Sequence, residues 1–477
     1  MTGAGPAMLV ARDAAAFLHQ RGSTPVARAV VAAEGSWLTD GDGHRVLDGH
    51  GNGCHHIGYR HPRLVDALTR QLATLPFAPR RFTNAPAVAL AERLAGLWPY
   101  GPARVLFAPS GSDAIEIALK LAYVATGRQG SIAFTGAWHG AGLGALSVGG
   151  RFAEAAPMPR LSGCRHVPAY WPTDGLGDAD AAARVSYQAL VAAFGNGPPP
   201  AALLAEPVHS APGLPPPWFW PAVARLARDH GSLLIFDEIP TGLGKTGRWF
   251  ASQHFDVTPD ITVLGKALGG AVMPLAALIA RADLDRAGHL AIGHVTHEKN
   301  PMLATAGLAT LDVLADGDLV ARAAELGARL AAGLDRLTAA GGALRGARVA
   351  GLLAALWLRP DQDPLAVERR CYALGLNLTV DRAGRLSLSL PLIVTASDID
   401  RVVAVLAQAL PAAEPVALPA VEPVALPAVE PVALPAVEPV ALPAVEPVAL
   451  PAVEPVALPA MEPVALPAME PVALPGD

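Results

Sequence analysis

The stretch LLIFDEIPTGLGKTGR, residues 233–248, decides the fold class. It opens with apolar residues and becomes polar at Asp237, as expected of a buried parallel strand whose carboxyl end carries a functional group. A second stretch, DITVLGKALGG at residues 260–270, repeats this arrangement with Lys266 just past the strand. A charged group in such a place is costly unless it has a partner, so both side chains are candidates for chemistry.

Working outward, the first 410 residues alternate short apolar runs with helical patterns. This predicts an α/β fold whose large domain has a mostly parallel, doubly wound sheet. Apolar residues at helical spacing predict a helix over 113–126, and the Asp-Gly pairs of WLTDGDGHRVLD, residues 37–48, predict a hairpin. The runs predicted as strands of the large sheet are Val105–Ala108, Ala202–Ala205, Leu233–Phe236, Ile261–Leu264 and Leu275–Ile279.

After residue 300 the pattern changes to that of a smaller α/β domain. We predict helices over 302–314 and 319–339, strands over 349–358 and 386–392, and a final helix that opens near Ser397 with a capping box. The predicted organisation is an N-terminal segment of the small domain (1–60), a large cofactor-binding domain (61–300), the C-terminal small domain (301–410) and a tail (411–477).

The tail repeats every eight residues as VEPVALPA or MEPVALPA. Proline at every fourth position removes helix hydrogen bonds and keeps the preceding residues extended, so the sequence predicts a low-complexity segment outside the fold. A solenoid is the rival interpretation of any repeat, but this unit has few bulky side chains with which to build a stacking core.

Composition excludes several classes of protein. The net charge is −6 and the basic residues are scattered, so nucleic acid is not an expected partner. There is no run of about 20 apolar residues and no leader-like start, so we expect a cytoplasmic protein without a membrane segment. The thiols Cys54, Cys164 and Cys371 are far apart, and we expect them to fill apolar space.

A phosphate site is indicated where VLFAPSGSDAIEIALKLA, residues 105–122, passes from strand to helix. Gly111 permits a tight turn there, and the free N–H groups at a helix start bind phosphate. Small residues are also common at such junctions, so this signal alone is weak. The stretch GLGKTG lacks the first glycine of a P-loop because position 239 is Ile239, and His297-Glu298 lacks the second histidine of H-E-x-x-H, so no metal is predicted.

Asp237 and Lys266 indicate cofactor chemistry. A buried carboxylate at Asp237 suits a protonated pyridine nitrogen, although a helix cap or a Mg²⁺ ligand would also explain it. Burial makes Lys266 an amine nucleophile suited to a Schiff base. The other lysines, Lys120, Lys245 and Lys299, are more simply explained as solvated surface charges.

Together these motifs resemble the class III aminotransferases over about residues 30–410. The resemblance is carried, in family order and spacing, by GSDAIEIALK, the aromatic-His-Gly at residues 138–140, AEPV, FDEI, LGKALGG and THEKNP. It implies a fold-type I enzyme that binds pyridoxal 5'-phosphate (PLP), works as a homodimer with active sites at the subunit interface, and acts on the amine of a small molecule.

The resemblance also implies roles for individual residues. Lys266 forms the Schiff base and moves the proton, and Asp237 pairs with the pyridine N–H. The remaining cofactor-binding residues are Gly111 and Ser112 at the phosphate, Thr296 from the neighbouring subunit, and Trp138, His139 and Ile239 around the ring. Glu206, in AEPV, corresponds to a family acid that lies near the substrate or behind the pocket wall.

The chain departs from the family where substrate is bound. Pro240 replaces a common glutamine, His209 is a candidate pocket residue, and Ser387 stands where many transaminases have an arginine for the substrate carboxylate. Arg385, on the same strand face by period two, is a candidate replacement.

Residues 50–84 further resemble a branch that contains (R)-1-hydroxy-2-aminoethylphosphonate ammonia-lyases. Arg80, Arg81 and His55 are then candidate phosphonate contacts, with surface or dimer-interface charge as the alternative. A transaminase is the first interpretation, a β-eliminating ammonia-lyase the second, an epimerase-type enzyme a third, and a non-catalytic cofactor- or nucleotide-binding protein the rival from another class.

Overall fold

A computed structural model describes residues 5–20, 26–151, 158–172 and 175–410. The predicted tail, 411–477, lies outside these described residues. The α-helices are α1 (Pro6–Ala16), α2 (Pro62–Thr74), α3 (Ala85–Leu97), α4 (Gly111–Thr126), α5 (Leu143–Val148), α6 (Ala179–Gly195), α7 (Phe219–Asp229), α8 (Pro301–Asp316), α9 (Leu319–Ala339), α10 (Pro364–Ala373) and α11 (Ala396–Ala409).

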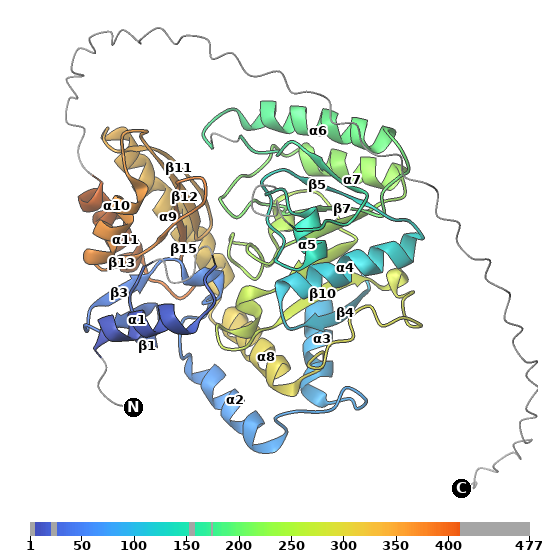
Figure 1. The fold of residues 1–477 in the computed structure, drawn as a ribbon, viewed down its shortest axis with the longest axis horizontal. Coiled ribbons are helices and arrows are strands. Elements are labelled where there is room, and N and C mark those ends of the chain that lie inside the picture. Colours follow the sequence, from blue (N-terminus) through green and yellow to red (C-terminus); the bar gives the residue numbers. More distant parts are fainter. Residues whose placement is uncertain (1–4, 21–25, 152–157, 173–174, 411–477) are drawn as a thin grey trace, which may run out of the picture. The chain divides into compact units, whose positions relative to one another are not determined.

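A seven-stranded sheet forms the centre of the larger part of the fold (Figure 1). Its order is β4-β10-β9-β8-β7-β5-β6, and all neighbours are parallel except β10, which runs antiparallel to both β4 and β9. The strands are β4 (Ala103–Ala108), β5 (Ser131–Phe134), β6 (Cys164–Val167), β7 (Ala202–Ala205), β8 (Leu233–Asp237), β9 (Ile261–Leu264) and β10 (Ala276–Arg281).

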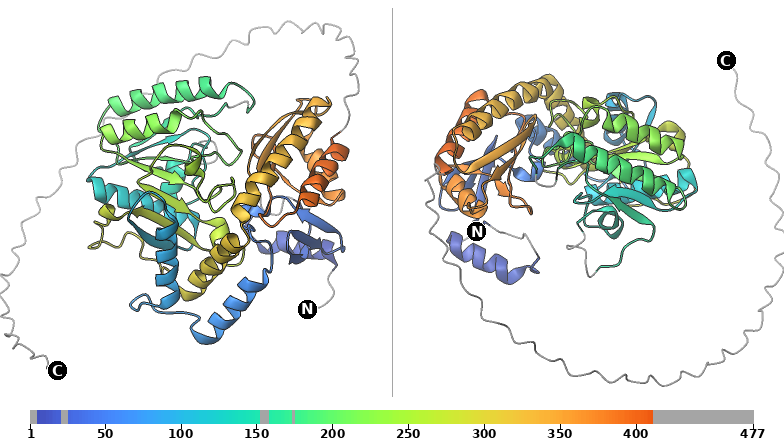
Figure 2. Two further views of the ribbon diagram at one scale, coloured as in Figure 1. Left: turned by 180° about the vertical axis from the view of Figure 1, so that it is seen from behind. Right: turned by 90° about the horizontal axis from the view of Figure 1, so that it is seen from above.

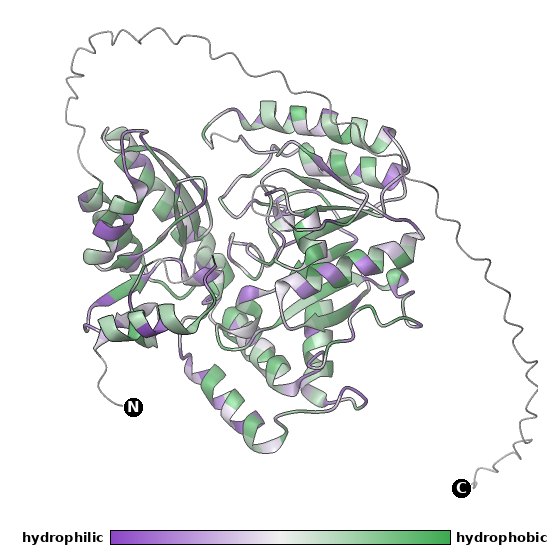
Figure 3. Cartoon of the chain, viewed as in Figure 1, coloured by the Kyte–Doolittle hydropathy of each residue, from purple (hydrophilic) through white to green (hydrophobic). Residues whose placement is uncertain are grey.

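Both faces of the sheet are buried at its central strands β7, β8 and β9, which explains why these strands are apolar runs. Helices α6 and α7 cover one face, where Leu203, Leu234 and Phe236 point, and α4 covers the other, where Leu204 and Ile235 point. The central strands are accordingly among the most hydrophobic elements in Figure 3. The carboxyl ends of β7, β8 and β9 therefore meet at one edge of a rigid core.

Two four-stranded sheets make up the rest of the described fold. One has the order β1-β2-β3-β13 and the other β11-β12-β15-β14. In the first, β13 pairs with β3 in parallel, so residues near 47 and 376 lie side by side although they are far apart in sequence (Figure 2). The strands are β1 (Val30–Glu34), β2 (Trp37–Asp40), β3 (Arg45–Asp48), β11 (Leu344–Ala350), β12 (Leu353–Leu358), β13 (Leu376–Asn377), β14 (Thr379–Val380) and β15 (Leu386–Ser389).

The predicted strand over 349–358 was wrong, because two strands meet there. A turn at Gly351 separates β11 from β12, and the backbone φ of +55° at this residue is one that glycine adopts without strain. The predicted hairpin is confirmed as β2 and β3, and the final helix begins after Thr395, whose side chain forms a capping box with Asp398. Within the described ranges, no helix combines the length and the apolar character needed to cross a bilayer.

Candidate active site

The start of α4 offers backbone N–H groups at the edge of the large sheet. Ser110 caps the helix by accepting a hydrogen bond from the backbone N–H of Asp113, and Gly111 is the first helical residue. A Cβ added at Gly111 would lie 2.7 Å from Ile239 Cδ1, so a side chain here would displace the end of the Ile239 side chain. The Ser112 hydroxyl accepts a hydrogen bond from the backbone N–H of Ala141 at 3.0 Å. The positive end of a helix is thus available for an anion.

Asp237 ends β8 and is almost completely buried, with 1% of its surface exposed. Its Oδ1 accepts a hydrogen bond from the backbone N–H of Ile239 at 3.0 Å, and its Oδ2 lies 2.8 Å from His139 Nδ1. His139 is buried as well, and its Nε2 has no hydrogen-bond partner among the described residues. The Asp237 carboxylate is therefore held by two hydrogen bonds, one to each oxygen, from His139 and from the Ile239 backbone.

Lys266 begins the 3₁₀ turn η4 (Lys266–Gly269) directly after β9 and Gly265. Its φ is +44°, an unfavourable value for a residue with a side chain. The Ile239 side chain faces both glycines that flank the site, since a Cβ added at Gly265 would lie 3.3 Å from Ile239 Cγ2. Ile239, two residues after the end of β8, therefore lies close both to the start of α4 and to the residue before η4.

Trp138, which precedes His139, has arginines near its ring that the sequence did not single out. Arg151 Cζ lies 5.4 Å and Arg382 Cζ lies 5.6 Å from the ring centroid. Burial lowers the pKa of Arg151, while Glu206 and Asp381 oppose that shift. Sequence spacing does not mark either arginine as a site residue. Arg151 follows a glycine pair in a loop, and Arg382 lies in the turn between β14 and β15.

Arg385 belongs to the same group of charges. Its Nε lies 2.6 Å from Asp381 Oδ2, and its guanidinium lies 5.5 Å from the ring centroid of Trp357. The charges of Arg385 and Arg151 both act on His209. The predicted candidate Arg385 is thus brought together with Arg151 and His209, in a group of residues that we call the arginine cluster: Arg151, Arg382 and Arg385 with the acids Glu206 and Asp381.

Glu206 and His209 follow β7 and are both 3% exposed. Glu206 Oε2 accepts a hydrogen bond from the backbone N–H of Ser210 at 2.9 Å, while Oε1 has no partner among the described residues. The His209 ring stacks on Trp171 with centroids 4.0 Å apart, and its Nε2 is likewise without a described partner. Two buried polar atoms beside the arginine cluster are therefore left to bind something else.

The other predicted substrate contacts are not brought to this cluster. Arg80 and Arg81 are exposed, and Arg80 Nη1 lies 3.5 Å from Glu298 in the segment that carries the exposed Thr296. Arg80 also lines a hollow of about 300 Å³ beside β4 and β10, which contains neither Asp237 nor Lys266.

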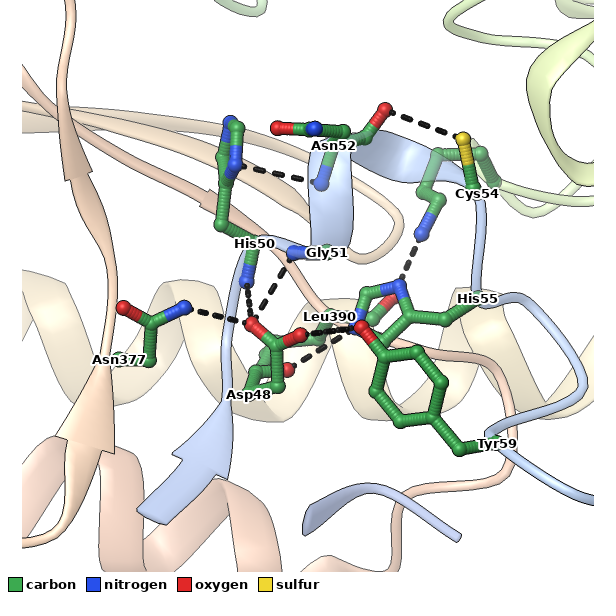
Figure 4. A network of polar contacts seen from close by, with 10 residues as sticks. Asp48, His50, Gly51, Asn52, Cys54, His55, Tyr59, Asn377 and Leu390 are labelled. Atoms are coloured by element: carbon green, nitrogen blue, oxygen red, sulfur yellow. Dashed lines mark hydrogen bonds and ion pairs between the residues drawn. The ribbon is translucent and has the colours of Figure 1, made fainter. Parts of the chain in front are cut away.

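His55 is fully buried behind Asp48, with its Nε2 3.0 Å from the Asp48 carbonyl oxygen (Figure 4). Burial lowers the pKa of His55 to about 4. These contacts tie the ring to the N-terminal segment and do not support a substrate contact. In the part of the chain that the structure describes, no group of three or more His, Cys, Asp or Glu side chains is arranged to hold a metal ion.

Comparison with known proteins agrees with this geometry. The model of the family "Aminotransferase class-III" matches residues 18–410. The chain is 34% identical over 430 residues to the (R)-1-hydroxy-2-aminoethylphosphonate ammonia-lyase of Vibrio splendidus, covering 84% of this chain and 89% of that protein. It is also 34% identical over 412 residues to the acetylornithine aminotransferase of Mycolicibacterium smegmatis, covering 85% and 98% of the two chains.

Solved structures give the same answer. An amine transaminase from an uncultivated Pseudomonas species, determined in its PLP-bound form, is 29% identical with a TM-score of 0.77, covering 83% of this chain and 98% of that one. An (S)-enantioselective omega-transaminase from Thermomicrobium roseum is 27% identical with a TM-score of 0.79, covering 86% and 99%. These likenesses confirm the predicted α/β fold of PLP fold-type I. The chain therefore belongs to the class III aminotransferase family and is a PLP-dependent enzyme of that family.

Proposed function

We propose that this enzyme is a transaminase that binds PLP between α4, β8 and η4 through Lys266 and acts on the primary amine of a small substrate. The observation that carries the proposal is the meeting of three elements around Ile239, which faces both Gly111 and Gly265. This closeness supports a proposed site that combines a helix N-terminus, a buried acid and an amine.

The residues present fit the cofactor. No described residue is hydrogen-bonded to Lys266 Nζ, and His139 Nε2 is buried without a described partner. The acid at the end of β8 already has its histidine and its backbone donor, so its orientation is set before a ring nitrogen arrives. The Ile239 side chain packs close to Gly111, which favours a small residue at the start of α4.

Each residue then has a physical task. When bound, PLP supplies an electron sink for the charge that develops on the substrate carbon next to the amine. The Asp237 carboxylate holds the proton of the ring nitrogen, and the Gly111 and Ser112 N–H groups bind the phosphate at the positive end of α4. Lys266 Nζ holds the cofactor between turnovers, then takes the proton from the substrate carbon and returns it.

The ring itself is held from two sides. We propose that Trp138 stacks on one face and Ile239 contacts the other. Thr296 is exposed in the single chain, which fits a role in which it reaches the phosphate of a neighbouring subunit. A homodimer with shared sites is therefore part of the proposal.

Borohydride trapping tests the assignment of Lys266. The full-length protein is loaded with PLP, reduced and digested, and the peptides are analysed by mass spectrometry. We expect the adduct on Lys266, together with a visible absorption band before reduction, and no turnover by Lys266→Ala. Lys120→Ala, which changes an exposed lysine, is the matched control. An adduct on another residue, or turnover by Lys266→Ala, would refute the proposal.

A second candidate function is a PLP-dependent ammonia-lyase acting on an amino-phosphonate. Two observations support it. A lyase of this kind is 34% identical to the chain. In the arginine cluster, Arg151 and Arg382 lie beside the Trp138 ring, and Arg385 lies near Arg151 and His209. Guanidinium groups suit oxyanions such as phosphonates and carboxylates. We propose that the substrate carries such an anion, whichever of the two reactions the enzyme performs.

Ammonia release separates the two reactions. The protein is incubated with candidate amines in the absence of a keto acid, and both ammonia and the cofactor spectrum are followed. A lyase returns its cofactor in each turnover, so it releases ammonia continuously. Conversion to pyridoxamine phosphate in a single turnover, without sustained ammonia, would reject the lyase and support the transaminase.

A further inference from the structure

Lys245 is fully buried, so the sequence-based expectation of a surface charge was wrong. It lies in the loop after β8, and its Nζ donates a hydrogen bond to the Leu390 carbonyl oxygen at 2.6 Å. Burial lowers the pKa of Lys245 to about 7, while the nearby Cys54 and Asp48 act in the opposite direction. A buried lysine is costly, so its surroundings are expected to provide partners.

Hydrogen bonds from three segments of the chain converge on this lysine. The Lys245 carbonyl oxygen accepts from the Leu352 backbone N–H at 3.0 Å, and the Leu352 carbonyl oxygen accepts from the Leu390 N–H at 3.0 Å. Lys245, the β11–β12 turn and the end of β15 thus form a closed triangle. A Cβ at Gly351 would collide with the Lys245 carbonyl oxygen and the Thr246 backbone, so the triangle is tightly packed.

The N-terminal segment joins the same group. The Gly49 carbonyl oxygen accepts from the Ser389 N–H at 2.6 Å, and the His56 carbonyl oxygen accepts from the Leu392 N–H at 2.8 Å. The His56 ring reaches back with Nε2 3.4 Å from the Gly242 carbonyl oxygen, in the loop that carries Lys245. Residues on both sides of Leu390 are therefore tied to residues 49–56 by backbone hydrogen bonds.

His55 and His56 each have a buried ring nitrogen that can accept a hydrogen bond. The Nε2 atoms of His55 and His56 face carbonyl oxygens, which only accept, so each Nε2 carries the proton and each Nδ1 is an acceptor. Both Nδ1 atoms are buried without a hydrogen-bond partner among the described residues. Lys245 is near enough for its charge to lower the pKa of both rings, although burial is the larger cause. A lysine ammonium has three N–H donors, of which Leu390 uses one.

The segments that Lys245 joins flank the side chain of Lys266. A Cβ added at Gly53 would lie 3.3 Å from Lys266 Cδ and 3.6 Å from Ser389 Oγ. Gly53 belongs to the short 3₁₀ turn η1 (Gly51–Gly53), and Ser389 precedes Leu390, the acceptor of the Lys245 hydrogen bond. Ser389 Oγ is buried without a described partner. The stem of Lys266 therefore lies against residues whose places depend on Lys245.

We propose that Lys245 is a positioning residue: its buried amine group, hydrogen-bonded to the Leu390 carbonyl oxygen, fixes the wall of Gly53 and Ser389 against Lys266. This inference rests on the role of Lys266 proposed above. In this proposal Lys245 contacts neither the substrate nor the cofactor. Its effect is exerted through the two chain segments that confine the reactive amine.

Amine labelling of the full-length, cofactor-stripped protein tests this assignment without relying on turnover. Wild type, Lys245→Met and Lys245→Arg are treated with acetic anhydride, and acetylation of Lys266 is measured by mass spectrometry relative to the exposed Lys120 in the same sample. Loss of the clamp should loosen the wall, so we expect the ratio to rise at least about threefold in Lys245→Met. Lys245→Arg, which keeps a cationic donor, should return the ratio toward that of wild type.

A purely structural role gives a different result. A lower melting temperature for Lys245→Met with an unchanged labelling ratio would overturn the proposal. Should Lys245→Met fail to fold, the labelling ratio is measured on Lys245→Gln, whose shorter, neutral side chain removes the ammonium that bonds Leu390, and the ratio should rise in the same way. Borohydride trapping on wild type is run in parallel: absence of a Lys266 adduct refutes the proposed function, whereas the labelling ratio still decides the role of Lys245.

Discussion

His139 Nδ1 lies 2.8 Å from Asp237 Oδ2, and both side chains are buried. The two residues are 98 positions apart in sequence and come from different connections of the large sheet. Because the acid accepts a hydrogen bond from this ring, Nδ1 carries the proton, and the histidine fixes the orientation of the carboxylate.

Loss of this histidine should weaken cofactor binding. His139→Leu removes one of the donors of Asp237, and groups that orient a binding residue in this way are typically worth at least about tenfold in affinity. We expect the Kd for PLP, measured by absorbance titration of the cofactor-stripped protein, to rise by about that factor. The exposed His289→Leu is the control. Equal affinity of His139→Leu and wild type would show that Asp237 is held well enough without the ring.

The charge of Asp237 should matter more for turnover than for binding. Asp237→Asn keeps the shape of the side chain but cannot balance a protonated ring nitrogen, so we expect kcat to fall by about a hundredfold or more. Steady-state kinetics with any accepted amine provide the measurement, and Asp229→Asn, at the exposed end of α7, is the control. Nearly normal turnover by Asp237→Asn would argue against the pyridine partnership.

The arginine cluster should select anionic amines. Arg385→Gln and Arg382→Gln each remove a guanidinium, so KM for an amine that carries a phosphonate or carboxylate should rise about tenfold. KM for a neutral amine of similar size should change by less than about twofold, because that substrate never used the charge. Arg359→Gln, a change on the exposed surface, is the control. A uniform rise in KM for both substrates would point to general damage rather than anion recognition.

Glu238, the neighbour of Asp237, should make stability depend on pH. Burial raises the pKa of Glu238 from 4.5 to about 7, against the hydrogen bonds donated by Ser252 and Ala251. In the unfolded chain the carboxyl loses its proton near its ordinary value, so this group's contribution to stability is fully present below pH 4.5 and is lost as the pH rises to about 7.

Urea unfolding of Glu238→Gln beside wild type measures this effect. The variant cannot titrate at this position. Its free energy of unfolding, minus that of wild type, should therefore increase as the pH rises from about 5 to about 8. Glu92→Gln, an exposed change in α3, should show no such trend. A constant difference between Glu238→Gln and wild type would mean that Glu238 has the same pKa in both states.

Five strands of the large sheet could be predicted from sequence because burial makes them apolar runs, whereas β5 and β6 were missed; β6, with the sequence CRHV, is mostly half-buried. The ranges 202–205 and 261–264 agree with β7 and β9 residue for residue. Strand direction leaves no such signal, so the antiparallel course of β10 could not be foreseen. The β11–β12 turn was missed because Gly351 is the only turn residue in an otherwise apolar stretch.

The candidate site, too, has residues that could be predicted from sequence and residues that could not. The positions of Asp237, Lys266 and Gly111 could be read from sequence, because Asp237 ends β8, and Lys266 and Gly111 come shortly after the ends of β9 and β4, where the chain itself determines position. Their roles stay predictions. Lys245 was misjudged since its loop looks polar and glycine-rich, and only the packing of distant segments buries it. Arg151 and Arg382 are brought near Trp138 by tertiary structure alone.

The left-handed backbone at Lys266 has a consequence for anyone who tries to stabilise this enzyme. Glycine would adopt a φ of +44° freely, whereas lysine there costs on the order of 1 kcal/mol or more. Selection for heat resistance alone would therefore favour glycine at the one position where the proposed chemistry requires an amine. Screens for robustness need to be coupled to a screen for turnover, or they will reward inactive molecules.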